Sequence, residues 1–483
     1  MLVLCFCMVQ LWFSTFNTDG VVGDRLLTNW IYQPEMQVRP RRYRFRIMNG
    51  DVSRYMRIAV VVEDENGAML GVDNKRFSFA EFYMIANDGN LMSYAVPFGV
   101  DYDPSQAATP GKSNRAGILP MMAIGERHDI IIDFGKYPGK ELYLINTMDH
   151  KHGRSPNGPK TFEESVQRVQ DILAEERDQQ SVFWQDTAVG KITRFKVVDQ
   201  LIDEDRSLDP ADYVEGNAQG NTLIPPAEHG IQVFDEGKED YRVNGERVQF
   251  RRFRWVRSGD EIMPEDWGDL PGTYEGASVP GDVADTTAAV YHHKDLAHAE
   301  IKAQKQTLAV SNQNEINLKW AVKTEFTNKF GLEADKGAYL ADPRVVSVTA
   351  TTGEFEVWEF DGNGGWMHNV HTHFEEGHLI SRDNGLPNNG IPDWEKFSRK
   401  DVYTVGSLLQ EEAGDSLRFS IRFRDLHGTF MTHCHNTNHE DGGMLNRWDI
   451  NNPGQVKAFS APMNTWNGCT YQSSITLEDV ESL

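Results

Sequence analysis

Residues 433–444 read HCHNTNHEDGGM, a stretch in which the thiol of Cys434 lies between two imidazoles. A third imidazole, His439, follows five residues after this cysteine, and the thioether of Met444 follows ten residues after it. A cysteine, two histidines and a weak axial methionine are the ligand set of a blue-copper electron-transfer site. The stretch therefore predicts a copper centre that needs one further histidine from elsewhere in the chain.

Residues 368–373, HNVHTH, offer that histidine as well as two more. The two stretches together hold six of the fifteen histidines of the chain. A buried histidine that serves only packing would explain one of these positions, but it would not explain their spacing. We therefore interpret both stretches as copper motifs.

The two stretches resemble the carboxyl-terminal copper motifs of the multicopper oxidases, a family that includes laccases, bilirubin oxidases and bacterial manganese-oxidising relatives. The family pattern is HPxHxH followed by HCHxxxHxxxxM, and the second motif matches in full. The first motif departs at Asn369, where proline is usual. That position contributes backbone and no ligand, so the copper assignment is unaffected.

The resemblance implies a role for each residue of the motifs. It implies a type 1 copper held by His368, Cys434, His439 and Met444, a type 2 copper held by His371, and a type 3 copper pair held by His373, His433 and His435. In the family, a reducing substrate gives up one electron at a time at type 1 copper, and four electrons then reduce dioxygen to water. Glu440 is expected to deliver protons to the dioxygen pocket, or alternatively to orient an imidazole.

The spacing within the second motif fits this division of roles. Alternate residues of a strand point to the same face of a sheet. His433 and His435 therefore face one side, whereas Cys434 faces the other. One short segment would touch two metal centres, with Cys434 and Glu440 as the residues that take part in catalysis.

The rest of the chain indicates an all-β fold, with tandem cupredoxin-like Greek-key β-sandwiches, an acidic linker and a short surface helix. Alternating or apolar runs separated by Gly and Pro turns predict strands. The runs that carry this prediction are 38–50, 125–134, 141–147, 191–199, 353–360 and 415–424. The apolar spacing in 161–180 predicts a surface helix that Thr161 and Glu164 cap, and Asn244-Gly245 predicts a hairpin.

We expect three parts. Residues 1–200 would form a sandwich that resembles the copper-free middle domain of the family, 201–304 a linker and an insertion, and 305–483 the copper-binding sandwich. The pair His150 and His152 lies in a charged segment with Pro and Gly, which favours a solvated loop over a ligand role.

The composition of the chain limits which binding partners and which cellular locations are compatible with it. The net charge of −24 argues against nucleic acid, and it is compatible with a cationic or metal-ion substrate or simply with solubility. Residues 1–16 are apolar but too short for a membrane span, so a signal segment and a strand both remain open. The four cysteines give no evident disulfide framework. The resemblance implies a periplasmic or secreted protein.

The histidine count bears on activity. The trinuclear centre of the family takes eight histidines, this chain supplies four, and no histidine precedes His128. We therefore expect a truncated form of a copper-dependent oxidase that does not reduce dioxygen by itself. The alternative is a type 1 copper electron-transfer module. Phenols, aromatic amines, tetrapyrroles and metal ions all remain open as the reducing substrate.

Overall fold

The computed structural model describes most of the chain, in ranges separated by gaps. These are residues 20–23, 25–100, 115–175, 186–200, 204–225, 231–235, 240–257, 318–327, 333–340, 348–361, 367–385, 388–406, 416–424, 426–441 and 444–451. The apolar start at 1–16, the insertion at 259–294 and the expected domain start at 305 lie outside these ranges.

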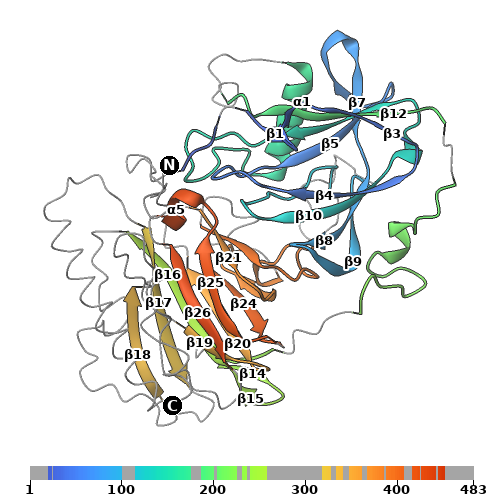
Figure 1. The fold of residues 1–483 in the computed structure, drawn as a ribbon. Helices are drawn as coiled ribbons and strands as arrows, with labels where there is room; N and C mark the ends of the chain where they lie inside the picture. Colours follow the sequence, from blue (N-terminus) through green and yellow to red (C-terminus); the bar gives the residue numbers. More distant parts are fainter. Residues whose placement is uncertain are drawn as a thin grey trace, which may run out of the picture.

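The amino-terminal sandwich consists of two sheets packed face to face (Figure 1). One sheet has the order β4 (Arg42–Met48), β10 (Arg127–Asp133), β8 (Phe82–Asn87), β9 (Asn90–Phe98). The other has the order β3 (Glu35–Val38), β12 (Gly190–Val197), β11 (Glu141–Asn146), β5 (Ile58–Glu63), β7 (Arg76–Phe79), β6 (Met69–Leu70). Apolar side chains from both sheets form the core, and Tyr43, Phe45 and Ile47 of β4 pack against it as the alternation in 38–50 predicts.

The carboxyl-terminal sandwich also has two sheets. The first has the order β18 (Glu333–Leu340), β17 (Leu318–Thr327), β16 (Gln249–Arg257), β20 (Phe355–Asp361), β24 (Ser416–Arg422), β22 (Gly377–Arg382). The second has the order β19 (Val348–Thr351), β26 (Leu445–Asn451), β25 (Gly428–Cys434), β21 (His368–Thr372), β23 (Val402–Val405). Its buried core includes the side chains of Cys434 and Met444 together with large aromatic residues such as Trp358 and Trp448.

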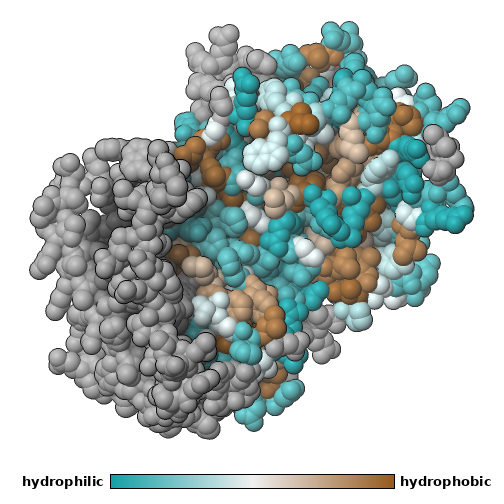
Figure 2. Space-filling model, viewed as in Figure 1, coloured by the Kyte–Doolittle hydropathy of each residue, from teal (hydrophilic) through white to brown (hydrophobic). Residues whose placement is uncertain are grey.

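Shorter elements complete the described part of the chain. They are β1 (Leu27–Thr28), β2 (Ile31–Tyr32), β13 (Gln232–Asp235), β14 (Asp240–Val243), β15 (Glu246–Arg247), α1 (Phe162–Ala174), α5 (Thr437–Asp441) and the 3-10 turns Val72–Asn74, Phe134–Lys136, Pro210–Tyr213 and Asn388–Gly390. The predicted all-β fold of two sandwiches with a surface helix is therefore confirmed. Figure 2 shows mostly hydrophilic residues on the described part of one face, with apolar residues in small patches.

The predicted surface helix is α1. The side chain of Thr161 accepts a hydrogen bond from the Glu164 amide, and the side chain of Glu164 accepts one from the Thr161 amide, so the capping box is confirmed. The helix ends earlier than the predicted range, because Glu175 adopts a left-handed conformation with φ of 50°. Val169, Ile172 and Leu173 are its buried apolar side chains. No helix among the described residues has the length and apolar character needed to cross a bilayer.

The segment predicted as linker and insertion contributes a strand to the carboxyl-terminal sandwich. The hairpin at Asn244-Gly245 joins β14 to β15, as predicted. The next strand, β16, pairs in parallel with β20, from Gln249 with Glu356 to Arg254 with Asp361. A sheet of the carboxyl-terminal sandwich therefore includes residues well before 305, and the three-part division of the chain stays a prediction.

Buried charges join the two sandwiches. The ammonium of Lys400 is fully buried and donates hydrogen bonds to Glu126 Oε1 at 2.6 Å and Asn87 Oδ1 at 2.9 Å. Asp88 and Glu395 place further carboxylate oxygens 3.6 and 3.7 Å from it. Burial alone would lower the pKa of Lys400, but these carboxylates raise it above its ordinary value. The interface therefore depends on a charged lysine that lies among acidic residues.

His128 makes the stability of the metal-free protein sensitive to acid. Its ring is buried with Nδ1 2.9 Å from Asn87 Nδ2, and burial lowers its pKa to about 3. The unfolded chain therefore binds one more proton than the folded chain between about pH 6.5 and 3, so stability falls as the pH falls through this window. We expect His128→Gln to reduce the change of the unfolding free energy with pH in this window by about 1.4 kcal/mol per pH unit, as measured by urea unfolding. The exposed His427→Gln is the control, and equal slopes in both variants would contradict the account.

Candidate metal centre

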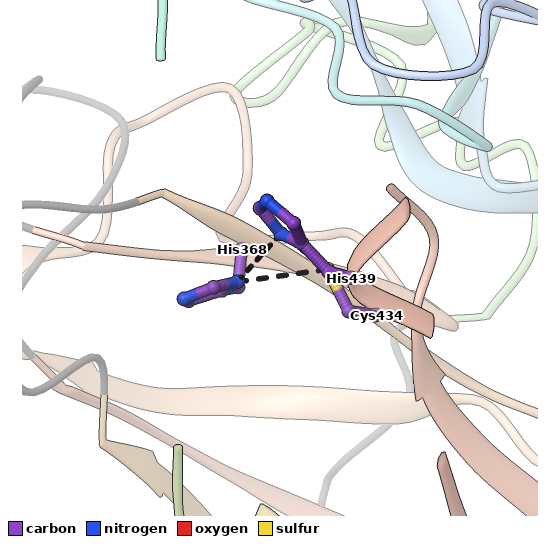
Figure 3. Close-up of side chains that lie close together, drawn as sticks. All are labelled: His368, Cys434 and His439. Carbon is purple, nitrogen blue, oxygen red and sulfur yellow. Dashed lines mark hydrogen bonds between the residues drawn. The ribbon is translucent and has the colours of Figure 1, made fainter. Parts of the chain in front are cut away.

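Two clusters of metal-ligating side chains lie at the end of the carboxyl-terminal sandwich that faces the amino-terminal sandwich. The first, called here the thiolate cluster, consists of His368 at the start of β21, Cys434 at the end of β25 and His439 in α5. Figure 3 shows the two imidazoles and the sulfur pointing toward one another. Cys434 Sγ lies 3.7 Å from His368 Nδ1 and 3.6 Å from His439 Nδ1, and the two nitrogens are 3.1 Å apart.

These distances fit a shared metal ion. An ion bound about 2.3 Å from sulfur and about 2.0–2.1 Å from nitrogen, at angles between tetrahedral and trigonal, holds sulfur and nitrogen about 3.6–3.8 Å apart. The two sulfur–nitrogen distances match this range. The nitrogen–nitrogen distance is a few tenths of an ångström shorter than such an ion requires. The imidazole rings of His368 and His439 therefore need to move apart by only a few tenths of an ångström to bind the ion together with Cys434.

Met444 belongs to the surroundings of the thiolate cluster. Its carbonyl accepts a hydrogen bond from the Cys434 amide at 3.0 Å, and its amide donates one to the His439 carbonyl at 3.1 Å. Its side chain is buried in the same core as Cys434. A soft thioether beside a thiolate and two imidazoles is the donor set that favours copper. The described residues thus hold a His/Cys/His set consistent with a type 1 copper site.

Burial controls the protonation of the cysteine. It raises the pKa of the Cys434 thiol to about 12, so the thiol keeps its proton in the metal-free protein at neutral pH. A coordinated metal ion removes that proton. Loading of the cluster therefore releases a proton at Cys434.

The second set, called here the histidine cluster, consists of His371, His373 and His433. His373 Nε2 and His433 Nε2 are 3.0 Å apart, and the ring centroids of His371 and His373 are 4.6 Å apart. The His435 ring lies beside the cluster, with its centroid 5.6 Å from that of His371 and 5.3 Å from that of His433. All four imidazoles predicted for the type 2 and type 3 coppers thus converge.

Strand geometry separates the two clusters as the sequence predicts. In the pairing of β21 with β25, Val370 lies opposite Cys434, and His371 lies opposite His433. Successive side chains of each strand point to opposite faces, so Cys434 reaches one cluster and His433 the other. The ligands of both motifs begin inside β21 and β25 themselves.

Glu440 lies against the histidine cluster. Its Oε2 is 3.0 Å from His433 Nδ1. Burial tends to raise the pKa of its carboxyl, but the hydrogen bond from His433 and the nearby imidazoles lower it overall. Burial, followed by the neighbouring imidazoles His371 and His433, lowers the pKa of His373 to about 4. The His373 imidazole is therefore neutral at neutral pH, and the Glu440 carboxylate lies at the edge of the cluster.

The pair Asp401 and Arg127 has no signal in the sequence motifs. His371 Nδ1 lies 3.1 Å from the Asp401 carbonyl oxygen and 3.5 Å from its Oδ1. The carboxylate receives hydrogen bonds from both terminal nitrogens of Arg127. Burial tends to raise the pKa of Asp401, but the bonds from His371 and Arg127 lower it to about 2. The two residues lie far apart in the sequence, so only the fold brings them to His371.

Asn369, which replaces the usual proline, connects the site to the amino-terminal sandwich. Its Oδ1 accepts a hydrogen bond from the Tyr55 hydroxyl at 3.2 Å, and its Nδ2 donates one to the Ile124 carbonyl at 2.9 Å. Its own carbonyl accepts one from the His435 amide at 2.7 Å. The departure from the family pattern thus supplies a buried polar link between the two sandwiches.

The expectation of a solvated loop at His150 is wrong. The ring of His150 is buried, with Nε2 3.2 Å from the Tyr55 amide, and burial lowers its pKa to about 4. The charged neighbours in the sequence predict exposure, whereas the ring packs against Tyr55 within the amino-terminal sandwich. The same segment meets the copper motif, since Asn436 donates a hydrogen bond to the Gly153 carbonyl at 3.1 Å. His150 is not part of either cluster.

Other acidic residues near the motifs have structural partners. Glu375 accepts hydrogen bonds from the amide and the guanidinium of Arg424, and Glu376 pairs with Arg399. These contacts connect the loop after β21 to the segment after β24, through Arg424, and to the segment before β23, through Arg399. They do not involve the imidazoles of the two clusters.

A family model described as "Multicopper oxidase" matches residues 308–454 of the chain. A laccase of Haloferax volcanii is 30% identical over 489 aligned residues, which cover 96% of this chain and 57% of the archaeal protein. A laccase of Bacillus subtilis is 29% identical over 125 residues, which cover 26% of this chain and 18% of that laccase. A bilirubin oxidase of Albifimbria verrucaria is 31% identical over 94 residues, 19% of this chain and 15% of that enzyme.

Two all-β sandwiches with a His/Cys/His set of this geometry define a cupredoxin-type copper protein. The match to the multicopper oxidase model covers the segment that carries both copper motifs, residues 308–454. The chain spans a little over half the length of the archaeal laccase. Among solved structures, the McoA multicopper oxidase of Aquifex aeolicus is 16% identical with a TM-score of 0.45, covering 91% of this chain and 62% of that chain.

Proposed function

We propose that this protein takes part in the oxidation of a reducing substrate, one electron at a time, at the thiolate cluster, coupled to the reduction of dioxygen to water at a centre that includes the histidine cluster. Four electrons and four protons convert one dioxygen molecule into two water molecules. The observation that supports this most strongly is that Cys434 belongs to one cluster while its chain neighbours His433 and His435 belong to, or lie beside, the other.

Copper held by His368, Cys434, His439 and Met444 would accept single electrons, because soft sulfur ligands favour its reduced form. The chain's own residues define the path that follows. An electron that arrives at Cys434 Sγ reaches His433 and His435 through one peptide unit on either side. The hydrogen-bonded backbone of β25 keeps this path rigid, since His433 pairs with His371 and Leu445. Both clusters therefore keep a fixed separation.

Glu440 is the residue that we propose as the proton donor to the dioxygen site. Its carboxylate lies at hydrogen-bond distance from His433 and is about one-third exposed, so it has access to both solvent and cluster. It can take a proton from water and pass it toward the imidazole edge of the cluster. The same contact also orients His433, so one side chain serves both purposes.

A second function, electron transfer at the thiolate cluster alone, is favoured by the number of imidazoles. The described residues bring together four, at positions 371, 373, 433 and 435, whereas the trinuclear centre of the family takes eight. The reducing substrate remains a prediction, with phenols, aromatic amines and metal ions as candidates. Activity outside the cytoplasm is part of the same proposal and rests on the family.

Oxygen consumption separates the two functions. The chain is loaded with copper, and dioxygen uptake is followed with an electrode after a phenolic donor is added. A type 1 spectrum without uptake is the result expected for four imidazoles per chain, and it supports electron transfer for the chain alone. Uptake that His373→Ala abolishes, with the blue colour retained, supports complete oxidase chemistry. If the chain takes up no copper at the thiolate cluster, both functions are wrong.

A further inference from the structure

We propose that Arg127 of the amino-terminal sandwich positions the copper ligand His371, and that Asp401 transmits this effect. Arg127 thereby couples the docking of the two sandwiches to metal binding at the histidine cluster. The inference rests on the proposed function, since it assumes that the histidine cluster holds a metal. It adds to that function a residue from outside the copper motifs and from the other sandwich.

The first contact is a two-pronged ion pair across the interface. Arg127 Nη1 lies 2.6 Å from Asp401 Oδ1, and Arg127 Nη2 lies 2.7 Å from Asp401 Oδ2. Two parallel bonds of this kind fix both the position and the plane of the carboxylate. Arg127 begins β10, whereas Asp401 immediately precedes β23, which pairs with the ligand strand β21.

The second contact passes this position on to the imidazole. His371 Nδ1 faces the Asp401 carbonyl oxygen at 3.1 Å and its Oδ1 at 3.5 Å. Both atoms only accept hydrogen bonds, so they hold the ring proton on Nδ1. The other nitrogen, Nε2, then has its lone pair available for a metal. Asp401 thus selects the tautomer and the ring orientation that a ligand requires.

The amino-terminal sandwich fixes Arg127 in turn. Its guanidinium donates hydrogen bonds to the carbonyl of Asp88 at 2.7 Å and to that of Gly125 at 3.1 Å. The Asp88 carboxylate also accepts a hydrogen bond from the Val402 amide at 3.2 Å. The turn at Gly125 lies so close to the cluster that a Cβ there would overlap the ring of His435. One short segment of the amino-terminal sandwich therefore reaches the surroundings of the cluster at two points, through Gly125 beside His435 and through Arg127 on Asp401.

The consequence is a reciprocal coupling. If docking of the sandwiches favours the metal-binding form of His371, metal binding favours docking by the same free energy. Loss of a group that orients a metal ligand typically weakens metal binding by about 10- to 100-fold. We expect an effect at the lower end of this range, because the carbonyl of Asp401 still faces His371 when its side chain changes.

The test uses the full chain with Cys434→Ser as background, so that the thiolate cluster does not compete for metal. Cu²⁺ affinity at the histidine cluster is measured by competition with a chelator, in Asp401→Asn and in Arg127→Ala. Each should bind Cu²⁺ on the order of 10-fold more weakly than the background. Arg127→Lys should lose less, since it keeps the charge but not the two-pronged geometry.

A matched control exists at the same interface. Asp393 pairs with Arg115 of the amino-terminal sandwich at 3.7 Å and is not part of either cluster. Asp393→Asn therefore removes an ion pair between the sandwiches without touching a ligand, and it should leave the Cu²⁺ affinity unchanged. A second readout needs no metal: nitrogen NMR of the histidine rings should show His371 protonated on Nδ1 in the parent chain and a mixture of tautomers in Asp401→Asn.

The outcomes distinguish this inference from the proposed function. No Cu²⁺ binding by the histidine cluster in the parent chain would reject the proposed function. Cu²⁺ binding by Asp401→Asn that is as tight as in the background chain, with an unchanged His371 tautomer, would reject the positioning role. Equal losses in Asp401→Asn and Asp393→Asn would reject it too, since docking alone would then be responsible. If Asp401→Asn does not fold, the comparison of Arg127→Lys with Arg127→Ala decides.

Discussion

Replacement of Cys434 with serine is expected to abolish the blue colour of the copper-loaded chain completely. The colour of a type 1 site comes from charge transfer between a thiolate and copper, and Cys434 supplies the thiol of the cluster. A serine hydroxyl is a hard, neutral donor at neutral pH and gives no such band. The measurement is visible absorption together with copper content after dialysis, in which the variant should retain less copper than the parent.

The matched control for this prediction is Cys469→Ser, the same change at a position that belongs to neither copper motif. The control should keep the full blue absorption. A Cys434→Ser variant that stays blue would contradict the assignment of the thiolate cluster. Retention of some copper without colour is compatible with it, because the histidine cluster lies on the other face of β25.

Replacement of Lys400 with methionine should cost about 3–5 kcal/mol of unfolding free energy at neutral pH, the usual effect of leaving buried charges without their partner. The side chain keeps its length, but Glu126, Asp88 and Glu395 lose the ammonium between them. Burial already raises the pKa of Glu126 to about 7 against the opposing effect of Lys400. Urea unfolding, followed by fluorescence, measures the loss.

The pH dependence of that loss has a definite sign. Without Lys400 the pKa of Glu126 rises further, so the folded variant binds a proton that the unfolded chain does not bind. The loss should therefore shrink as the pH falls from alkaline values toward about 7, and below that pH the contribution of Glu126 to the loss should stay constant, because Glu126 then binds its proton in the folded parent as well. Adding Glu126→Gln to the variant should restore part of the stability. Lys396→Met, at an exposed pair with Glu215, should cost less than about 1 kcal/mol, and a similar cost at both lysines would contradict the prediction.

Local patterns were sufficient to predict the individual elements of the fold. Alternating side chains predict β4, apolar runs predict β10 and β11, and the capping pair Thr161 and Glu164 predicts α1. The parallel pairing of β16 with β20 could not be predicted. It joins residues about 100 positions apart in sequence, and a strand pattern does not indicate which sheet the strand enters.

The residues of the candidate site also fall into a group that the sequence predicts and a group that it does not. The ligands lie in two short motifs whose spacing reflects a chemical requirement, so sequence alone predicts which imidazoles come together. Asp401 and Arg127 act through tertiary contacts, and neither stands in a motif that marks it. His150 shows the opposite error, because a charged segment predicts exposure whereas the ring is buried beneath Tyr55. Contacts between domains are the part of the site that local sequence patterns do not encode.

Electron paramagnetic resonance of the copper-loaded chain, with copper content measured on the same sample, tests the central claim most directly. The claim is that His368, Cys434 and His439 form a type 1 centre and that the histidine cluster is a separate metal site. We predict a signal with the narrow copper hyperfine splitting of a type 1 centre, which Cys434→Ser removes and His373→Ala leaves intact. A spectrum with only ordinary, wide hyperfine splitting, unchanged by Cys434→Ser, would contradict the account.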